Sequence, residues 1–158
     1  MIIYNKELQN MILVNFEDYK KKSEKYIIGE RNGKGREYYK DELVYEGEYL
    51  KGKRNGKGKE YNYDGDLIFK GQYLNGIRNG KGKEYYNNGK LKFEGEYLNG
   101  KRNGKGKEYY SDGKLKFEGE YLNGKRNGKG KEYHNNGKLR FEGEYLNGQI
   151  KEKKIAKL

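Results

Sequence analysis

Hydrophobic and polar residues alternate in short segments along most of this chain. In the segment LKFEGEYL, Leu91, Phe93 and Tyr97 would face one way, and lysine and glutamate side chains would face the other. Alternation with a period of two residues is typical of a half-exposed β-strand. The pattern predicts strands over residues 45–50, 57–62, 67–74, 81–86, 91–98, 105–110, 115–122, 129–134 and 139–146.

Two kinds of turn separate these predicted strands. The segment NGKRNG at 99–104 contains Asn-Gly twice, and SDGK at 111–114 turns the chain again. Asn-Gly readily adopts the positive φ values that close a tight hairpin. Gly95 and Gly106 lie inside predicted strands, where we expect each to leave room for an aromatic ring from the adjacent strand. Strands and turns at this spacing, with no helical pattern between them, predict an antiparallel meander.

The strand and turn pattern recurs with a period of 24 residues. The units open at Tyr45, Phe69, Phe93, Phe117 and Phe141, and the last is cut short after Gly148. In such an array each unit buries its apolar face against its neighbours. We therefore predict an elongated single-layer β-array of five to six units, the first of them degenerate.

The degenerate first unit is YIIGERNGKGREYY, at 26–39. Its glycines Gly29, Gly33 and Gly35 align with Gly52, Gly56 and Gly58 of the next unit. The chain is thus divided into an N-terminal cap at 1–25, the repeat array at 26–148 and a basic C-terminal tail at 149–158.

The two ends of the chain do not share the repeat pattern. Apolar residues near the N-terminus follow helical spacing, but the run MILVNF is equally typical of a strand, so helix and strand both stay open for the cap. The tail QIKEKKIAKL fits either a short basic helix or a frayed terminus. A repeat array needs a cap at its open edge, and 1–25 would supply one.

Composition shows what such a chain can pack. Hydrophobic residues make up 32% of the 158 residues and charged residues 38%, which is too little apolar matter for an ordinary two-layer globule. Disordered chains are poor in aromatic residues, whereas this one has 18 Tyr and 5 Phe. We therefore expect the rings to form the core. The candidate ladders are Tyr45, Phe69, Phe93, Phe117 and Phe141, and Tyr49, Tyr73, Tyr97, Tyr121 and Tyr145.

The sequence predicts no secretion signal and contains no cysteine. The N-terminal segment has no basic region ahead of an apolar core, and no apolar run approaches the roughly 20 residues of a spanning helix. The chain has no Cys, which is compatible with a reducing compartment. We expect a cytoplasmic protein whose contact with a membrane, if any, is peripheral.

The repeated motif resembles a known family. The pattern (F/Y)-E-G-E-Y-x-N-G-K-x-x-G-x-G resembles the MORN repeat, and GKGKEYYNNGKLKFEGEYLNGK is similar to the variant found in YwqK-type bacterial proteins. Tyr97 and Gly106 stand where tryptophan is common in these repeats, and the period is 24 residues where 23 is commoner. The resemblance implies an all-β scaffold that binds partners or copies of itself, with phospholipid binding often proposed.

Residues suited to catalysis are scarce. His134 is the one histidine, and it occupies a position where other units carry Asn62, Tyr86 or Tyr110, so we interpret it as a neutral substitution. The pair Glu94 and Glu96 could suggest an acid–base couple, but it recurs beside lysines in unit after unit, which indicates cross-strand charge ladders. We predict that the protein is not an enzyme and needs no cofactor and no metal.

Repeated cations and tyrosines supply a candidate interaction surface. Stripes of lysine and arginine interleaved with tyrosine can attract phosphates, although solvated lysines also simply prevent strand edges from pairing. The candidate residues are Tyr49, Tyr73, Tyr97, Tyr121, Tyr145, Lys101, Arg102, Lys105, Lys107, Lys125, Arg126, Lys129 and Lys131.

Repetition without chemical variety favours a non-catalytic scaffold that mediates protein–protein interaction or self-association into a homo-oligomer. The first alternative is a peripheral module that binds anionic phospholipid at a membrane surface, which the net charge of +12 would assist. The second, an antitoxin-like binding protein, follows from the YwqK resemblance alone. A nucleic-acid partner is not expected, because the sequence has no recognisable reader motif.

Overall fold

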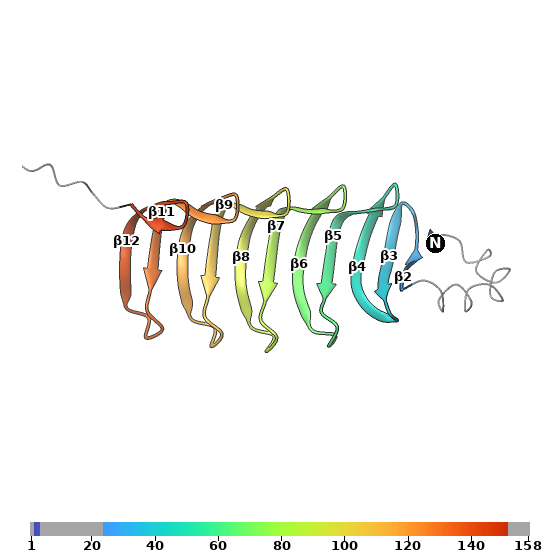
Figure 1. The fold of residues 1–158 in the computed structure, drawn as a ribbon, viewed down its shortest axis with the longest axis horizontal. Coiled ribbons are helices and arrows are strands. Elements are labelled where there is room, and N and C mark those ends of the chain that lie inside the picture. The colour runs from blue at the N-terminus through green and yellow to red at the C-terminus, as the bar shows by residue number, and fades with distance from the viewer. Residues whose placement is uncertain (1, 4–23, 152–158) are drawn as a thin grey trace, which may run out of the picture.

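One open sheet makes up the whole described structure, which is a computed structural model covering residues 2–3 and 24–151. The strand order in space is the order in the sequence (Figure 1). The strands are β1 (Ile2–Ile3), β2 (Lys25–Gly29), β3 (Gly33–Tyr39), β4 (Glu42–Leu50), β5 (Lys53–Tyr61), β6 (Leu67–Leu74), β7 (Ile77–Tyr85), β8 (Leu91–Leu98), β9 (Lys101–Tyr109), β10 (Leu115–Leu122), β11 (Lys125–Tyr133), β12 (Leu139–Leu146) and β13 (Gln149–Ile150). From β2 to β13 every neighbouring pair is antiparallel, which confirms the predicted all-β meander.

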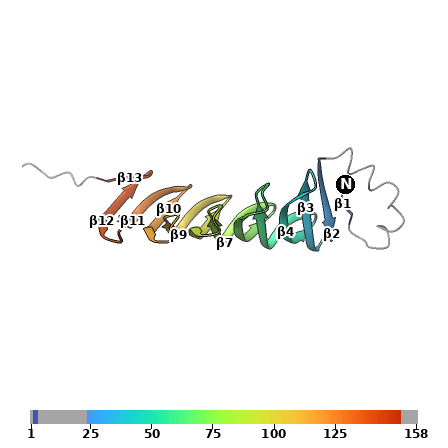
Figure 2. The ribbon, with the colours of Figure 1, turned by 90° about the horizontal axis from the view of Figure 1, so that it is seen from below.

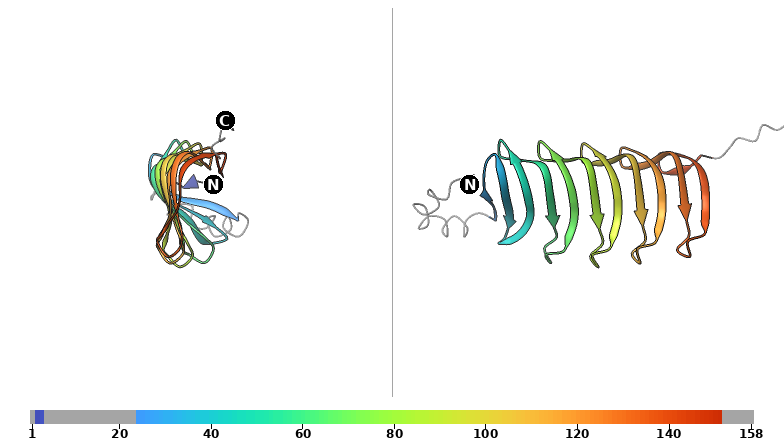
Figure 3. Two further views of the ribbon diagram at one scale, coloured as in Figure 1. Left: turned by 90° about the vertical axis from the view of Figure 1, so that its left-hand side faces the viewer. Right: turned by 180° about the vertical axis from the view of Figure 1, so that it is seen from behind.

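The short strand β1 pairs with β2 in parallel. Most of the predicted cap and residues 152–158 of the predicted tail lie outside the described residues, so the alternatives of helix or strand for 4–23 stay predictions. β1 and β13 lie at opposite ends of the elongated array (Figure 2). Viewed along the array, successive units overlap in part and fan out gradually from one end to the other (Figure 3, left). Equivalent residues of successive units therefore form gently twisted rows.

Where a unit contains Asn-Gly twice, the first Asn-Gly closes a tight hairpin and the second does not. Asn99 and Gly100 have φ values of 49° and 79°, as a two-residue hairpin turn requires. Gly104 also has a positive φ, of 78°, but it lies inside β9, where the register with β8 shifts between Gly95 and Tyr97. The second Asn-Gly is therefore part of a β-bulge.

Because of this bulge, the second strand of each hairpin has bounds that differ from the predicted ones. β9 begins at Lys101, four residues before the predicted start, and ends one residue earlier than predicted, at Tyr109. The prediction took the whole of NGKRNG for a turn, because turns and bulges both use Asn-Gly to reach positive φ. The first strands of the later hairpins, such as β8 over 91–98, have the predicted bounds. β4 ends at Leu50 as predicted but begins at Glu42, three residues before the predicted start.

The alignment predicted for the first unit is wrong at Gly29. Gly29 pairs with Gly35 across β2 and β3, just as Gly47 pairs with Gly58 across β4 and β5. Gly29 therefore takes the place of the strand glycine Gly47, not of a turn glycine. The first hairpin is correspondingly shorter, and it lacks an equivalent of the later core tyrosines.

The aromatic rings form a continuous chain of edge-to-face contacts on one face of the sheet. Phe93 is fully buried, and its ring centre lies 5.7 Å from that of Tyr97 in its own unit and 5.3 Å from that of Tyr121 in the next. The ring planes meet at 89° and 85°, the geometry that aromatic pairs favour. This confirms the predicted ladders as the core, with Phe141 at the end partly buried.

Two strand glycines make room for each ring. A Cβ atom on Gly106 would lie 2.5 Å from Cζ of Phe93, and one on Gly95 would lie 2.7 Å from the same atom. The expected space for a ring from the adjacent strand is confirmed at Gly106. At Gly95 the ring comes from the same strand, because Phe93 lies flat along β8 toward Tyr97.

An arginine covers each ring where an ordinary fold would place a second layer. The guanidinium of Arg102 lies 4.1 Å from the centre of the Phe93 ring, a cation–π contact. The same group donates hydrogen bonds of 3.0 and 2.6 Å to Glu84 of the preceding unit, and the Tyr97 hydroxyl donates to Glu84 at 2.6 Å. Burial alone would raise the pKa of Glu84, but these hydrogen bonds outweigh it and hold the pKa below its usual value.

This arginine lock joins each unit to the one before it and stops at the end of the array. The cations are Arg54, Arg78, Arg102 and Arg126, stacked on Tyr45, Phe69, Phe93 and Phe117. Ile150 occupies the next equivalent position, so Phe141 has no arginine above it. The buried hydroxyls of Tyr49 and Tyr145, the first and last tyrosines of their ladder, have no hydrogen-bond partner among the described residues.

Arg102→Ala is expected to lower the free energy of unfolding by roughly 1–3 kcal/mol, because it removes charge-assisted hydrogen bonds and uncovers a ring. Solvent screening keeps the figure modest, since the arginine side chain is 21% exposed. Chemical denaturation would measure the loss. Arg102→Lys is the matched control and should rescue little, because lysine keeps the charge but cannot form the fork or stack as a plane. Full recovery in the lysine variant would contradict the lock.

Candidate ligand-binding groove

The face of the sheet opposite the rings carries a long groove with a glycine floor. One glycine from each strand pairs directly with the glycine of the next strand, from β4 to β12. These are Gly47, Gly58, Gly71, Gly82, Gly95, Gly106, Gly119, Gly130 and Gly143. The groove above them has a volume of about 1790 Å³ and runs across the strands from β2 to β12. It is long enough for an extended chain.

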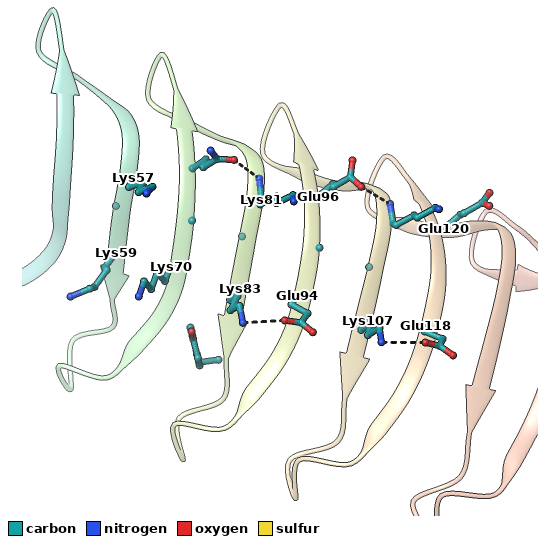
Figure 4. Close-up of a pocket in the computed structure, with 18 of the residues that line it drawn as sticks. Lys57, Lys59, Lys70, Lys81, Lys83, Glu94, Glu96, Lys107, Glu118 and Glu120 are labelled. Atoms are coloured by element: carbon teal, nitrogen blue, oxygen red, sulfur yellow. Dashed lines mark hydrogen bonds and ion pairs between the residues drawn. The ribbon is translucent and has the colours of Figure 1, made fainter.

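Charged side chains on either side of each glycine form two walls. Strand alternation turns residues such as Glu94 and Glu96 away from the Phe93 face and into the groove, and Lys105 and Lys107 of β9 do the same. Figure 4 shows both rows, with acids and lysines on alternate strands over much of the groove. The groove therefore has walls of mixed charge above a bare backbone floor.

Ion pairs join neighbouring strands along one wall, as the cross-strand charge ladders predicted from the sequence require (Figure 4). Lys83 lies 3.1 Å from Glu94, and Lys107 lies 3.4 Å from Glu118. Tyr109 donates a hydrogen bond of 2.7 Å to Glu94, and this bond, with help from Lys83, lowers the pKa of Glu94. Burial and the same hydrogen bond raise the pKa of Tyr109 to about 12. Such exposed pairs contribute at most about 1 kcal/mol each, so the walls stay open to exchange with a partner.

The residues of the predicted interaction surface are divided among three places. Its tyrosines Tyr49, Tyr73, Tyr97, Tyr121 and Tyr145 are 4% exposed and belong to the core, so their rings are not accessible to a partner. Its arginines Arg102 and Arg126 lie on the same face and are held in the arginine lock. Lys101 and Lys125 follow the hairpin turns outside the groove. Lys105, Lys107, Lys129 and Lys131 line the groove. The candidate surface is thus reduced to these four lysines.

Sequence reasoning missed the groove itself and the structural role of the lock. The lock had a signal in the sequence, because the cation at its position is arginine in all four complete units, whereas the other cations of these units are nearly all lysine. The groove had none, since its floor depends on a register that pairs each strand glycine with a glycine on both neighbouring strands, within a unit and between units.

The described part of the chain was searched for clusters of metal-ligating side chains and for membrane-spanning helices. Within the described residues, no group of three or more His, Cys, Asp or Glu side chains could hold a metal ion. His134 is exposed in a turn, where its backbone N–H donates to the carbonyl of Lys138. The part of the chain that the structure describes contains no helix long and apolar enough to span a membrane.

Comparison with family models gives five matches along the array. The model described as "MORN repeat" matches residues 26–44, 45–67 and 93–114. The model described as "MORN repeat variant" matches residues 78–99 and 126–147. MORN repeats are generally protein-binding or membrane-binding repeats. The resemblance noted in the sequence is therefore confirmed.

Comparison with individual proteins adds little. No curated protein matches the chain. Among the solved structures that match is one titled "Crystal structure of GtfA/B complex bound to UDP and GlcNAc", with 14% identity and a TM-score of 0.31. The match covers 73% of this chain and 23% of that one, so this chain corresponds to a minor part of the larger protein. A likeness this weak carries no argument about function.

Proposed function

Because this chain belongs to the MORN repeat family, we propose that it is a non-catalytic scaffold that binds protein partners along the glycine-floored groove. The observation that carries the proposal is the continuity of the groove across the units, on the face that the aromatic core leaves free. Each unit presents nearly the same charges to it. A partner lying along it would make many modest contacts, each strengthened by the effective concentration that the first contact creates.

A protein partner fits this groove better than a flat anionic surface does. The two walls carry glutamates as well as lysines over most of their length, with Glu94, Glu96, Glu118 and Glu120 as examples. An anionic membrane would be repelled by these acids, whereas a polypeptide of mixed charge could pair with both kinds of side chain. The net charge of +12 keeps anionic phospholipid as the second candidate. Sedimentation with phosphatidylserine vesicles, reversed by salt, would favour that candidate.

Binding is expected to depend on the number of units more than on any single residue. A partner isolated from the native cell would be measured against Lys107→Ala and against a deletion of residues 93–116. The deletion removes one full period, because Phe117 then follows residue 92 in the place of Phe93, so the fold should persist. We expect roughly a threefold loss or less for Lys107→Ala and a much larger loss for the deletion.

Circular dichroism and the unfolding midpoint would show that both variants are folded. Complete loss of binding in Lys107→Ala, with the fold intact, would contradict distributed binding. It would point instead to a single localised site.

A further inference from the structure

The alternation of charge along the groove is interrupted at β6. In β4, β8, β10 and β12 both groove positions are glutamates, but in β6 they are Lys70 and Gln72. The flanking strands β5 and β7 carry lysines at both groove positions, as β9 and β11 do. Three adjacent strands therefore place five lysines and no acid in the groove (Figure 4). This lysine cluster consists of Lys57, Lys59, Lys70, Lys81 and Lys83.

The structure of the sheet does not require this interruption. Lys70 lies directly opposite Lys59 on one side and Lys83 on the other, and like charges directly opposite each other destabilise a sheet. Gln72, by contrast, keeps the structural role of the glutamate that it replaces. Its side-chain oxygen accepts a hydrogen bond of 2.8 Å from the backbone N–H of Lys81, as Glu96 accepts one from Lys105. At β6 the bulge is kept while the negative charges are removed.

Several donors in the cluster have no partner. Lys59 is paired with Glu46 at 2.8 Å and Lys83 with Glu94, but Lys57, Lys70 and Lys81 form no ion pair with any described residue. The hydroxyl of Tyr85 likewise donates no hydrogen bond to any described residue. In the other units this hydroxyl donates to the glutamate that Lys70 replaces, as Tyr61, Tyr109 and Tyr133 show with bonds of 2.8, 2.7 and 2.9 Å. Of the tyrosines in the described residues, Tyr85 alone lines the groove.

We propose that the lysine cluster, with Gln72 and Tyr85, binds a short acidic segment within an extended polypeptide partner. The ammonium groups and the Tyr85 hydroxyl would donate to its carboxylates. Three strands span about 10 Å, which matches roughly three residues of an extended chain. This inference rests on the proposed function, because it assigns the chemistry of the partner to one place in the same groove.

The neighbours of the cluster limit the length of the anionic part. On the β4 side the groove continues past Glu46 and Glu48, and on the β8 side past Glu94 and Glu96. A long polyanion such as a nucleic acid would meet these acids on both sides. A bilayer surface would approach the projecting side chains of both signs before it reached the floor. A short acidic segment flanked by basic or neutral residues avoids both conflicts.

Lys70→Glu combined with Gln72→Glu tests the proposal by restoring the pattern of the other units. The probe is a fluorescent synthetic peptide with three consecutive glutamates between glycine and serine residues, and its anisotropy measures binding. The restored variant should fold at least as well as the parent, because β6 then copies the charges of β8. We expect it to bind the peptide roughly tenfold more weakly or worse, since the donors that face the glutamates are neutralised or repelled.

Two further measurements separate a site from general attraction. Lys138→Glu combined with Lys53→Gln lowers the net charge by the same amount outside the groove, and should leave peptide affinity nearly unchanged. Glu118→Lys combined with Glu120→Gln copies the β6 residues into β10, between β9 and β11. There the lysines already stand at the groove positions, so we expect a second binding site for the peptide and a doubled stoichiometry.

The proposal is overturned if the restored variant binds the peptide as the parent does, or if the control outside the groove loses as much. It is also overturned if the peptide does not bind, and phosphatidylserine vesicles sediment the parent but not the restored variant. The scaffold function is tested separately by the unit deletion. Peptide binding that depends on β6, together with partner affinity insensitive to the deletion, would remove the scaffold function and keep the acidic-segment site. The reverse result would keep the scaffold and remove this site.

Discussion

Phe93→Ala is expected to lower the free energy of unfolding by roughly 3–5 kcal/mol, as removal of a fully buried phenylalanine does in well-packed cores. The ring is 0% exposed, lies on Gly95 and Gly106, and contacts Tyr97 and Tyr121. In a single-layer sheet no second layer can move in to fill the space. The substitution would also leave Arg102 without the ring on which it stacks.

Phe141→Ala is the matched control for this prediction. Phe141 is only partly buried, contacts the ring of Tyr145, and has no arginine above it. We expect its substitution to cost less than half as much as that of Phe93, because less surface is buried and fewer neighbours lose a contact. Urea unfolding followed by circular dichroism would compare the two variants. Equal losses would mean that the rings do not stabilise the array through neighbouring units.

The predicted strands succeeded where side-chain alternation decides burial. β8 begins at Leu91 and ends at Leu98, as the pattern requires, because a shift by one residue would expose Phe93 and Tyr97. The second strands were wrong at their starts for a local reason. Asn103 and Gly104 have the residue types of a hairpin turn, and the choice between turn and bulge depends on the pairing with β8.

The role of Arg102 could not be read from the charge pattern alone. A polar residue on a strand is normally expected to face solvent, and on that ground the sequence predicts Arg102 in an interaction surface. A single-layer sheet has no opposing layer, so the planar guanidinium completes the core above Phe93 while Glu84 and Glu108 accept its hydrogen bonds. The arginine lock thus covers the rings where other folds use a second apolar layer, which agrees with the low content of apolar residues in this chain.

The groove depends on relations between units that the sequence does not display. The substitution of Lys70 and Gln72 for two glutamates is visible in the sequence, but it means little until β5, β6 and β7 are known to be neighbours. Adjacency brings Lys59 and Lys83 directly opposite Lys70. The two substitutions in β6 therefore concentrate positive charge at one place in the groove.

Alkaline pH is expected to unfold the array cooperatively as its core tyrosines ionise. Burial, together with hydrogen bonding to a glutamate and the charge of that glutamate, raises the pKa of Tyr73, Tyr97 and Tyr121 far above the ordinary value of 10.0. The unfolded chain therefore loses these protons first as pH rises. The stability that the neutral tyrosines contribute is complete below pH 10 and is lost progressively above it. By about pH 12 three such groups would remove roughly 8 kcal/mol, which is comparable to the whole stability of a small domain.

The measurement follows tyrosinate absorbance and circular dichroism in one alkaline titration. Because the pKa of each core tyrosine lies far above 10.0 in the folded sheet, its absorbance should rise in the same step in which β-structure is lost. Tyr97→Phe keeps the ring between Phe69 and Phe93 but has no proton to lose, so its stability should fall less steeply with pH than that of the parent. Complete ionisation of the tyrosines with the β-signal unchanged would show that their hydroxyls are not held by Glu60, Glu84 and Glu108. That result would contradict the hydrogen bonds of the arginine lock.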